Sequence, residues 1–196
     1  MGWDSAMARA GIGKALIQAF QRARPQQIDA LQHAIGDAAW RSHDTCNALR
    51  WVPLSHHMSI VVATRAIVGP DGQAVRYWTQ AWNDLLSRAG LKWFAPIAPG
   101  LKRTSEMMLE YGPRVLQQMF KGVGDVHVAI RDPGPNEYGE WNQSGFDTAR
   151  YHFDAYIEGT LGALEAGTQL LSETITVELA EKNASAGSFV VRFDKV

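Results

Sequence analysis

The most reactive side chains gather in one short stretch, where His43-Asp44-Thr45-Cys46 is followed ten residues later by His56-His57. An imidazole beside a thiol can take its proton and favour the nucleophilic thiolate, so Cys46 with His57 is one candidate catalytic pair. No local signature of a thiol enzyme surrounds Cys46. The alternative is a buried or half-buried thiol that packs as a small apolar side chain. We therefore assign no catalytic residue.

The same residues are candidate metal ligands, because a zinc site needs three or four converging nitrogen, oxygen or sulfur atoms. His43, Cys46, His56 and His57 are of the right types. Successive residues of a helix point about 100° apart, so the adjacent His56 and His57 rarely bind one ion. We expect no metal site here, with His57 packed under a helix and His56 in solvent.

Short catalytic motifs do not identify an enzyme class in this sequence. Gly11-Ile12-Gly13 begins like a dinucleotide fingerprint, but Leu16 occupies the position of the third glycine and no strand is expected before it. No Walker A loop, HExxH, GxSxG or CxxC occurs in the sequence. This argues against the common nucleotide-binding and hydrolase families.

Tryptophan is more informative in this chain. Seven tryptophans in 196 residues is a high number, and Trp51, Trp78, Trp82, Trp93 and Phe94 fall in its central region. The helical spacing of Trp78 and Trp82 is typical of core packing. The functional alternative is an apolar ligand cavity, in which tryptophan N–H groups provide polar contacts. An apolar patch of this kind could equally be buried in a homodimer.

Apolar spacing indicates that the first part of the chain is helical. Helices are expected over 5–22, 25–38, 56–68, 72–89, 100–111 and 115–120. Residues 41–51 read as a loop, Gly69-Pro70-Asp71-Gly72 as a turn, and Gly112-Pro113 as a helix break.

From Asp125 the apolar period becomes two, which is typical of strands. Strands are expected over 125–131, 137–141, 169–181 and 189–193, with one helix over 148–166. His127 lies on the strand face opposite Val126 and Val128, which predicts a surface position.

The order of helices followed by β-β-α-β-β predicts an α+β fold with a mostly antiparallel sheet. We expect a single domain over 1–196, with a helical N-terminal part (about 5–122) packed on a sheet part (about 125–194). The helices over 72–89 and 148–166 are the natural covers of the sheet.

Composition excludes some classes of partner and favours one cellular compartment. The net charge is −1, so no basic excess exists to neutralise nucleic acid. One cysteine excludes an intrachain disulfide and favours a reducing compartment. We find no apolar run long enough to span a membrane and no apolar core of a signal peptide at the start, so we expect a cytoplasmic protein.

Two stretches together resemble a known family. They are the run from Gly11-Ile12-Gly13 to Leu31 with Leu49-Arg50-Trp51-Val52-Pro53, and the closing pattern of 156–161 followed by 187–193. The chain resembles a bacterial paralogous family abundant in myxobacteria. That family looks related to the ligand-binding fold shared by haem nitric-oxide (H-NOX) sensors, 4-vinyl-reductase-type domains and Golgi-transport subunits.

The resemblance implies helices packed on an antiparallel sheet with a pocket between them, used for sensing or scaffolding. Haem sensors of this fold use a helix histidine as iron ligand and a Tyr-x-Ser-x-Arg motif for the propionates. The matching segment here, 101–110, has no histidine, and the motif does not occur. Haem held in another way, through His57 or His152, remains an alternative.

Our leading hypothesis is a non-enzymatic sensory or ligand-binding domain that holds a small apolar molecule between helices and sheet. The alternatives are a haem-binding gas or redox sensor, a homodimeric interaction module that contacts a signalling partner, and a Cys–His enzyme. The expected ligand-binding residues are Trp78, Trp82, Trp93, Phe94, Met108, Phe153, Ile157 and Ile175.

Overall fold

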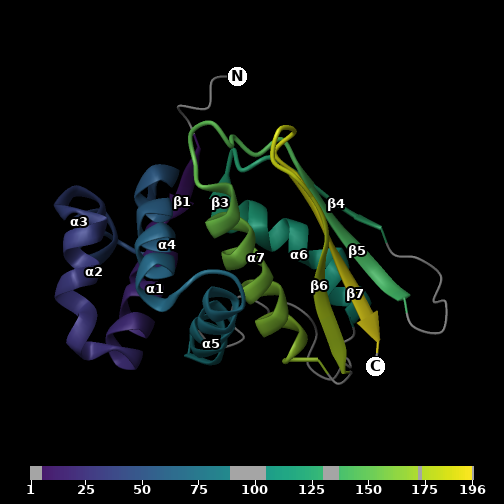
Figure 1. The fold of residues 1–196 in the computed structure, drawn as a ribbon, viewed down its shortest axis with the longest axis horizontal. Coiled ribbons are helices and arrows are strands. Elements are labelled where there is room, and N and C mark those ends of the chain that lie inside the picture. Colours follow the sequence, from purple (N-terminus) through teal and green to yellow (C-terminus); the bar gives the residue numbers. More distant parts are fainter. Residues whose placement is uncertain (1–5, 89–104, 130–136, 172–173, 196) are drawn as a thin grey trace.

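The computed structural model describes residues 6–88, 105–129, 137–171 and 174–195. Figure 1 shows α1 to α4 on one side, a four-stranded sheet on the other, and α5, α6 and α7 between them. The helices are α1 (Ala10–Ala23), a 3₁₀ turn (Pro25–Gln27), α2 (Ile28–Ile35), α3 (Asp37–Asp44), α4 (Leu54–Val68), α5 (Gly72–Arg88), α6 (Ser105–Met119) and α7 (Phe153–Thr168). This arrangement confirms the α+β fold and the helical N-terminal part.

The strands form two antiparallel sheets. They are β1 (Met7–Arg9), β2 (Trp51–Pro53), β3 (Phe120–Lys121), β4 (Asp125–Ala129), β5 (Glu137–Ser144), β6 (Ile175–Asn183) and β7 (Ser188–Lys195). The order is β2-β1-β3 in the small sheet and β4-β5-β7-β6 in the large one. The large sheet therefore contains the four strands expected from the sequence.

The small sheet was not expected, because the sequence predicted a helix over 5–22, and that range includes the residues of β1. Ala8 pairs with Val52 and Phe120, and these three side chains are buried. The pairing holds the chain extended until Ala10, where α1 begins. Three strands distant in sequence meet here, and local periodicity cannot report such a pairing.

The large sheet has one buried and one solvated face. Trp141 pairs with Val128 and Val191, and Gln143 pairs with Phe189 on the same face. His127 pairs with Asn142 on the other face and is exposed, which confirms its predicted surface position. A register shift interrupts the pairing of β6 with β7 between Leu179 and Glu181.

Several predicted boundaries were wrong, and glycine explains one of them. The helix predicted over 25–38 is divided at Gly36, whose φ of 83° lies in the left-handed region that favours glycine. After it, α3 continues to Asp44 and covers part of the predicted loop over 41–51. Strand β2 then begins at Trp51.

The predicted break at Gly112-Pro113 was also wrong, because α6 continues through Pro113. Proline in a helix interior removes one backbone hydrogen bond. Packing on β5 offsets that loss: Leu109 is fully buried, and Gly112 lies against Trp141.

The helix expected over 148–166 begins later, at Phe153, with His152 as its N-cap. The strand expected from 169 begins at Ile175 instead, because α7 runs on to Thr168. A turn joins β6, which ends at Asn183, to β7, and Gly187 adopts a φ of 58° there.

Candidate functional site

The helical part meets the sheet part through α7. Trp78 of α5 is buried against Gly162 of α7, where a Cβ atom on the glycine would overlap with the Cβ atom of the tryptophan. The helices α5 and α7 are thus in direct contact at this level, with glycine permitting the approach.

Helix α6 lies directly on the buried face of β5. A Cβ atom on Gly139 would come within 2.5 Å of Leu109 Cδ1, and one on Gly112 would come within 3.0 Å of Trp141 Cζ3. Two glycines, one on the strand and one on the helix, therefore permit the close approach of α6 and β5.

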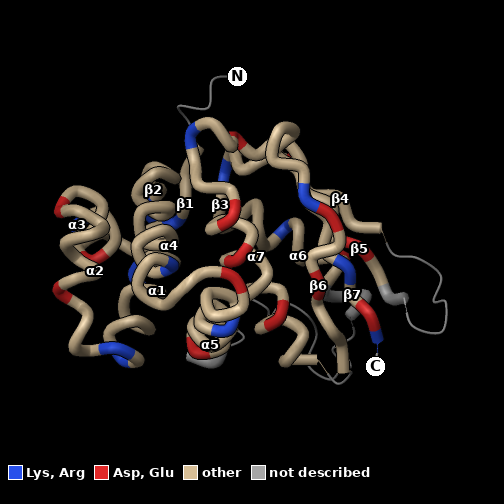
Figure 2. The backbone as a smooth tube through the Cα atoms, viewed as in Figure 1, with Lys and Arg blue, Asp and Glu red and all other residues tan. Residues whose placement is uncertain are grey.

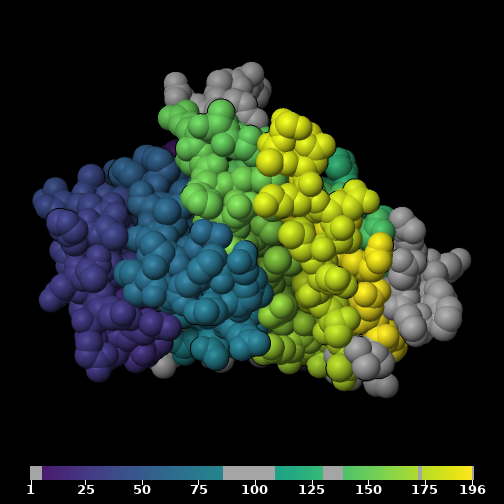
Figure 3. Space-filling model, in the orientation of Figure 1, coloured from purple at the N-terminus to yellow at the C-terminus, as the bar shows by residue number. Residues whose placement is uncertain are grey.

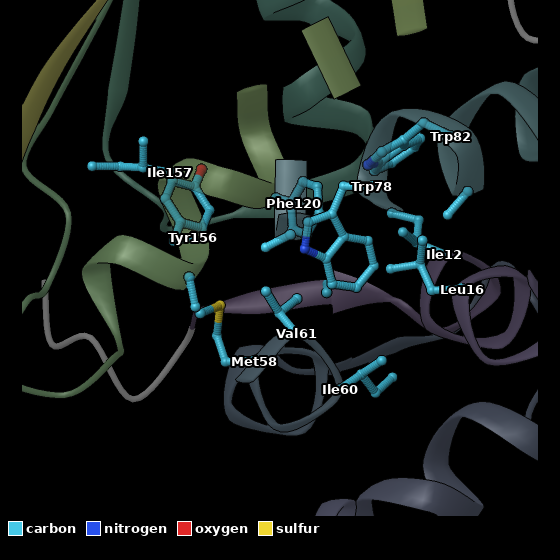
Figure 4. Packing of buried hydrophobic residues seen from close by; sticks show 14 of the residues in the cluster. Ile12, Leu16, Met58, Ile60, Val61, Trp78, Trp82, Phe120, Tyr156 and Ile157 are labelled. Atoms are coloured by element: carbon cyan, nitrogen blue, oxygen red, sulfur yellow. The ribbon is translucent and has the colours of Figure 1, made fainter. Parts of the chain in front are cut away.

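The expected ligand-binding residues lie in several parts of this junction. Trp78 and Trp82 are buried on α5, Phe153 and Ile157 are buried on α7, and Ile175 is half-buried on β6. Trp93, Phe94 and the side chain of Met108 lie outside the described residues. Figure 4 shows Trp78 beside Phe120 and Val61, with Trp82 on its other side.

Phe153 belongs to a separate aromatic cluster. Its ring centroid lies 5.6 Å from that of Phe146 and 6.1 Å from that of Phe189. Phe146 in turn stacks on Tyr156 at 4.2 Å. The cluster joins the start of α7 to β7, so Phe153 has a clear packing role.

Buried polar atoms without hydrogen-bond partners mark the junction. They include Trp78 Nε1, Trp141 Nε1 and Gln143 Oε1. An unpaired buried polar group costs about 1–3 kcal/mol. A site that receives a ligand with one or more polar atoms is one setting in which such groups persist.

Trp141 and Gln143 were missed as site residues. Gln143 Nε2 donates to Val123 O at 2.9 Å and to the Tyr156 hydroxyl at 2.7 Å. Burial raises the pKa of Tyr156 to about 12, so this hydroxyl keeps its proton at neutral pH. The sequence did contain a signal for these two residues. They occupy alternate positions with polar neighbours on a strand that we predicted to end at residue 141 and that continues to Ser144.

A hollow of about 600 Å³ opens elsewhere, at the turn between β6 and β7. Exposed residues from Glu181 to Ser185 line one side, and Ser188 to Val190 line the other. This hollow is polar and lies apart from the tryptophans. The cavity predicted between α5, α7 and the sheet stays a prediction.

Two buried histidines lie together in the helical part. His43 of α3 and His57 of α4 have ring centroids 6.2 Å apart, and the His57 ring lies 5.1 Å from that of Phe120. His43 Nδ1 is 3.1 Å from Ala10 O, while His43 Nε2 and His57 Nδ1 have no hydrogen-bond partner. Figure 1 shows α3 and α4 on the side remote from the large sheet.

Burial controls the protonation of this pair. Desolvation and, to a smaller extent, the neighbouring His43 together lower the pKa of His57 to about 3. Desolvation also lowers the pKa of His43. Both imidazoles are therefore neutral at pH 7. His57 is buried as predicted, whereas His56 is half-buried with its Nδ1 3.0 Å from the Ser42 hydroxyl, so its predicted position in solvent was wrong.

The described residues do not fit a histidine-ligated haem at the junction with the sheet. Helix α6 has no histidine and lies directly on β5, leaving no room between them for a flat macrocycle at Gly139 and Gly112. His152 is exposed and accepts a hydrogen bond from the Ala155 N–H as the N-cap of α7. His57 is wedged between His43 and Phe120.

Cys46 is half-buried and follows α3 in the chain. Its nearest polar contact is Arg50 Nη1, at 3.9 Å from Sγ. No hydrogen bond among the described residues links it to His57, whose ring neighbours are His43 and Phe120. The described residues also contain no group of three or more metal-ligating side chains.

An ion pair between half-buried Arg65 and buried Glu158 ties α7 to α4 and to the connection that follows α4. Arg65 Nε donates to both carboxylate oxygens of Glu158, at 3.0 Å and 2.8 Å. The backbone N–H of Asp71 donates to the same carboxylate at 2.9 Å. The hydrogen bond to Glu158 raises the pKa of Arg65. One buried carboxylate thus links three segments.

Within the described ranges, no helix is long and apolar enough to span a bilayer. Charged residues are scattered along the elements of both halves, as Figure 2 shows.

No protein-family model and no curated protein matches the sequence. Solved structures do match, and H-NOX domains are among them. A structure from work on haem distortion in the H-NOX family has a TM-score of 0.66 at 16% identity, over 95% of this chain and 94% of that chain. A Cs H-NOX variant has a TM-score of 0.66 at 15% identity, over 95% and 96% of the two chains.

An oxygen-binding H-NOX domain related to soluble guanylate cyclases is also similar, with a TM-score of 0.57 at 16% identity over 92% and 91% of the two chains. Identities this low establish shared architecture and leave the resemblance to a myxobacterial family as a prediction. The chain has the H-NOX fold.

Proposed function

We propose that this chain is a sensory domain of the H-NOX fold that binds a small, mainly apolar molecule at the junction of α5, α6, α7 and the large sheet. The observation that carries the proposal is the set of unpaired polar atoms there, above all the buried N–H groups of Trp78 and Trp141. Indole N–H groups usually find a partner when buried. A ligand carbonyl, hydroxyl or ether oxygen would supply the missing acceptor.

Native mass spectrometry of gently purified protein tests this proposal directly. We expect an adduct of defined mass that is released on denaturation. Trp141→Phe removes the N–H group and keeps a ring, so it should lower ligand occupancy by about tenfold while costing little stability. The matched control is Phe189→Leu, which changes the same buried sheet face without removing a polar atom. An apo mass for the native protein contradicts the proposal.

A haem-binding gas sensor is the second candidate, and the similarity to an oxygen-binding H-NOX domain favours it. Its test is haemin titration followed by the Soret band. His57→Leu and His152→Ala would each remove one candidate axial ligand. A saturable Soret band that is lost in one of these variants supports haem. An absorption spectrum without a Soret band, together with an organic adduct in the mass spectrum, supports the first candidate.

A further inference from the structure

The outer face of the small sheet carries an unusual arrangement of charge. Strand alternation points five side chains outward, and we call this set the Trp51 face: Met7, Arg9, Trp51, Pro53 and Lys121. Their strand neighbours Ala8, Val52 and Phe120 are buried. The face combines apolar and cationic side chains.

Two cations share one indole ring on this face. The Arg9 guanidinium carbon lies 3.8 Å from the Trp51 ring centroid, and Lys121 Nζ lies 4.3 Å from it. Each cation is attracted to the face of the ring by its quadrupole. The indole therefore brings two like charges together.

Arg9 is held in position before any partner arrives. Its Nε donates to Gln118 O at 3.2 Å, and its Nη1 donates to Leu49 O. These bonds leave Nη2 with its donors available. Within the described ranges, no carboxylate forms an ion pair with Arg9 or Lys121. The mutual repulsion of the two cations is thus uncompensated by any described acidic side chain.

An apolar side chain borders the face. Leu49 is 58% exposed, and it is the large hydrophobic residue that stands out as exposed among the described ones. Its backbone oxygen accepts the Arg9 hydrogen bond, so Leu49 lies next to the paired cations. Leu49 therefore adds one apolar contact beside the two cations, which a partner protein could cover.

We propose that the Trp51 face docks an acidic segment of a partner protein, in which carboxylates neutralise Arg9 and Lys121 and an apolar side chain covers Leu49. Charge complementarity selects the occupant. A nucleic acid fits less well, because the chain has a net charge of −1 and the face offers only this small group of cations. The inference is independent of the ligand proposed for the junction with the large sheet.

The test uses the full chain and a short fluorescein-labelled peptide of glutamate and leucine, with binding followed by anisotropy. Lys121→Glu reverses the charge of an exposed side chain and should weaken binding by about fivefold. The matched control is Arg76→Glu, the same kind of reversal at an exposed position of α5. We expect it to bind the peptide like the native chain.

Four further measurements complete the design. A peptide in which lysine replaces glutamate should not bind, and high salt should weaken binding of the acidic peptide. Trp51→Leu should also weaken binding, because it releases both cations from the ring. The Trp51 indole N–H resonance should shift on titration, which reports the site directly.

Specific results overturn the proposal. They are equal binding by the native chain and Lys121→Glu, an equal loss in Arg76→Glu, or an unmoved Trp51 resonance. Tighter binding of a single-stranded oligonucleotide than of the acidic peptide would also overturn it, in favour of nucleic acid. Because neither Lys121 nor Arg76 is buried, these variants should fold, as circular dichroism will check.

Discussion

The stability of the domain should fall steeply in mild acid because of His57. In the folded protein, burial lowers the pKa of this imidazole to about 3, from 6.5. The unfolded chain takes up a proton near pH 6.5, and the folded chain does not until about pH 3. The stability from burying a neutral His57 is therefore complete above pH 6.5 and is lost progressively below it.

The size of the effect follows from linkage. Each pH unit below the unfolded pKa lowers the free energy of unfolding by about 1.4 kcal/mol for one group. Going from about pH 7 to about pH 5 should thus cost about 2 kcal/mol through His57. Burial lowers the pKa of His43 as well, so its contribution has the same sign. A loss of this size is a large part of the stability of a typical domain.

Urea unfolding followed by far-ultraviolet circular dichroism at several pH values measures this slope. His57→Leu keeps an apolar group between His43 and Phe120, and its slope should be smaller by about one proton. His127→Gln changes an exposed histidine and should keep the native slope. If His57→Leu fails to fold, the imidazole resonances of the native protein give the same titration directly.

Two outcomes would refute the reasoning. One is a free energy of unfolding that stays flat over this pH range in the native protein. The other is an unchanged slope in His57→Leu. Either would mean that the unpaired His57 Nδ1 has water or another acceptor that stabilises the imidazolium in the fold.

Three other changes test the packing described above. Glu158→Gln leaves Arg65 without a counter-charge and should lower the free energy of unfolding in urea by about 2–4 kcal/mol. The control is Asp154→Asn, in a half-exposed ion pair with Lys182, which should lower it by less than about 1 kcal/mol. Trp82→Ala should lower the free energy of unfolding by about 3–5 kcal/mol if Trp82 is only a core residue. A larger loss in the free energy of ligand binding than in that of unfolding would place Trp82 at the ligand. Gly139→Ala should lower the melting temperature, at a cost of about 1–3 kcal/mol, because α6 must move away from β5, while Gly72→Ala meets nothing within 4 Å and should have little effect.

The sequence predicted the large elements well, because each carries a complete local pattern. Trp78 and Trp82 lie on a helix with regular apolar spacing, and α5 was expected over nearly its observed length. The alternation of Phe189, Val191 and Phe193 likewise predicted β7. In both cases the apolar residues of the one buried face were sufficient to define the type of element and the side that faces the core.

The parts that failed depend on distant partners. Strand β1 exists because Ala8 pairs with Val52 and Phe120, and neither pairing is visible in a local window. The continuity of α6 across Pro113 depends on β5, which follows it in the chain.

The candidate site was harder to predict than the fold. Its tryptophans could be named from composition and spacing, but Trp141 and Gln143 required the register of β5 against β7. The residue types gave the chemistry that could occur. Only the tertiary packing of helices and strands determined which polar atoms are buried without a partner.

The register shift between β6 and β7 affects how the molecule behaves at high concentration. Strand β6 is at the edge of the large sheet, so its outer backbone groups could pair with another chain. Figure 3 shows this strand at the surface of the molecule, in yellow-green. The irregularity at Leu179 and Glu181 bends the edge, and Glu178 and Lys182 add exposed charge beside it. The same feature that interrupts the ladder thus guards the domain against edge-to-edge aggregation.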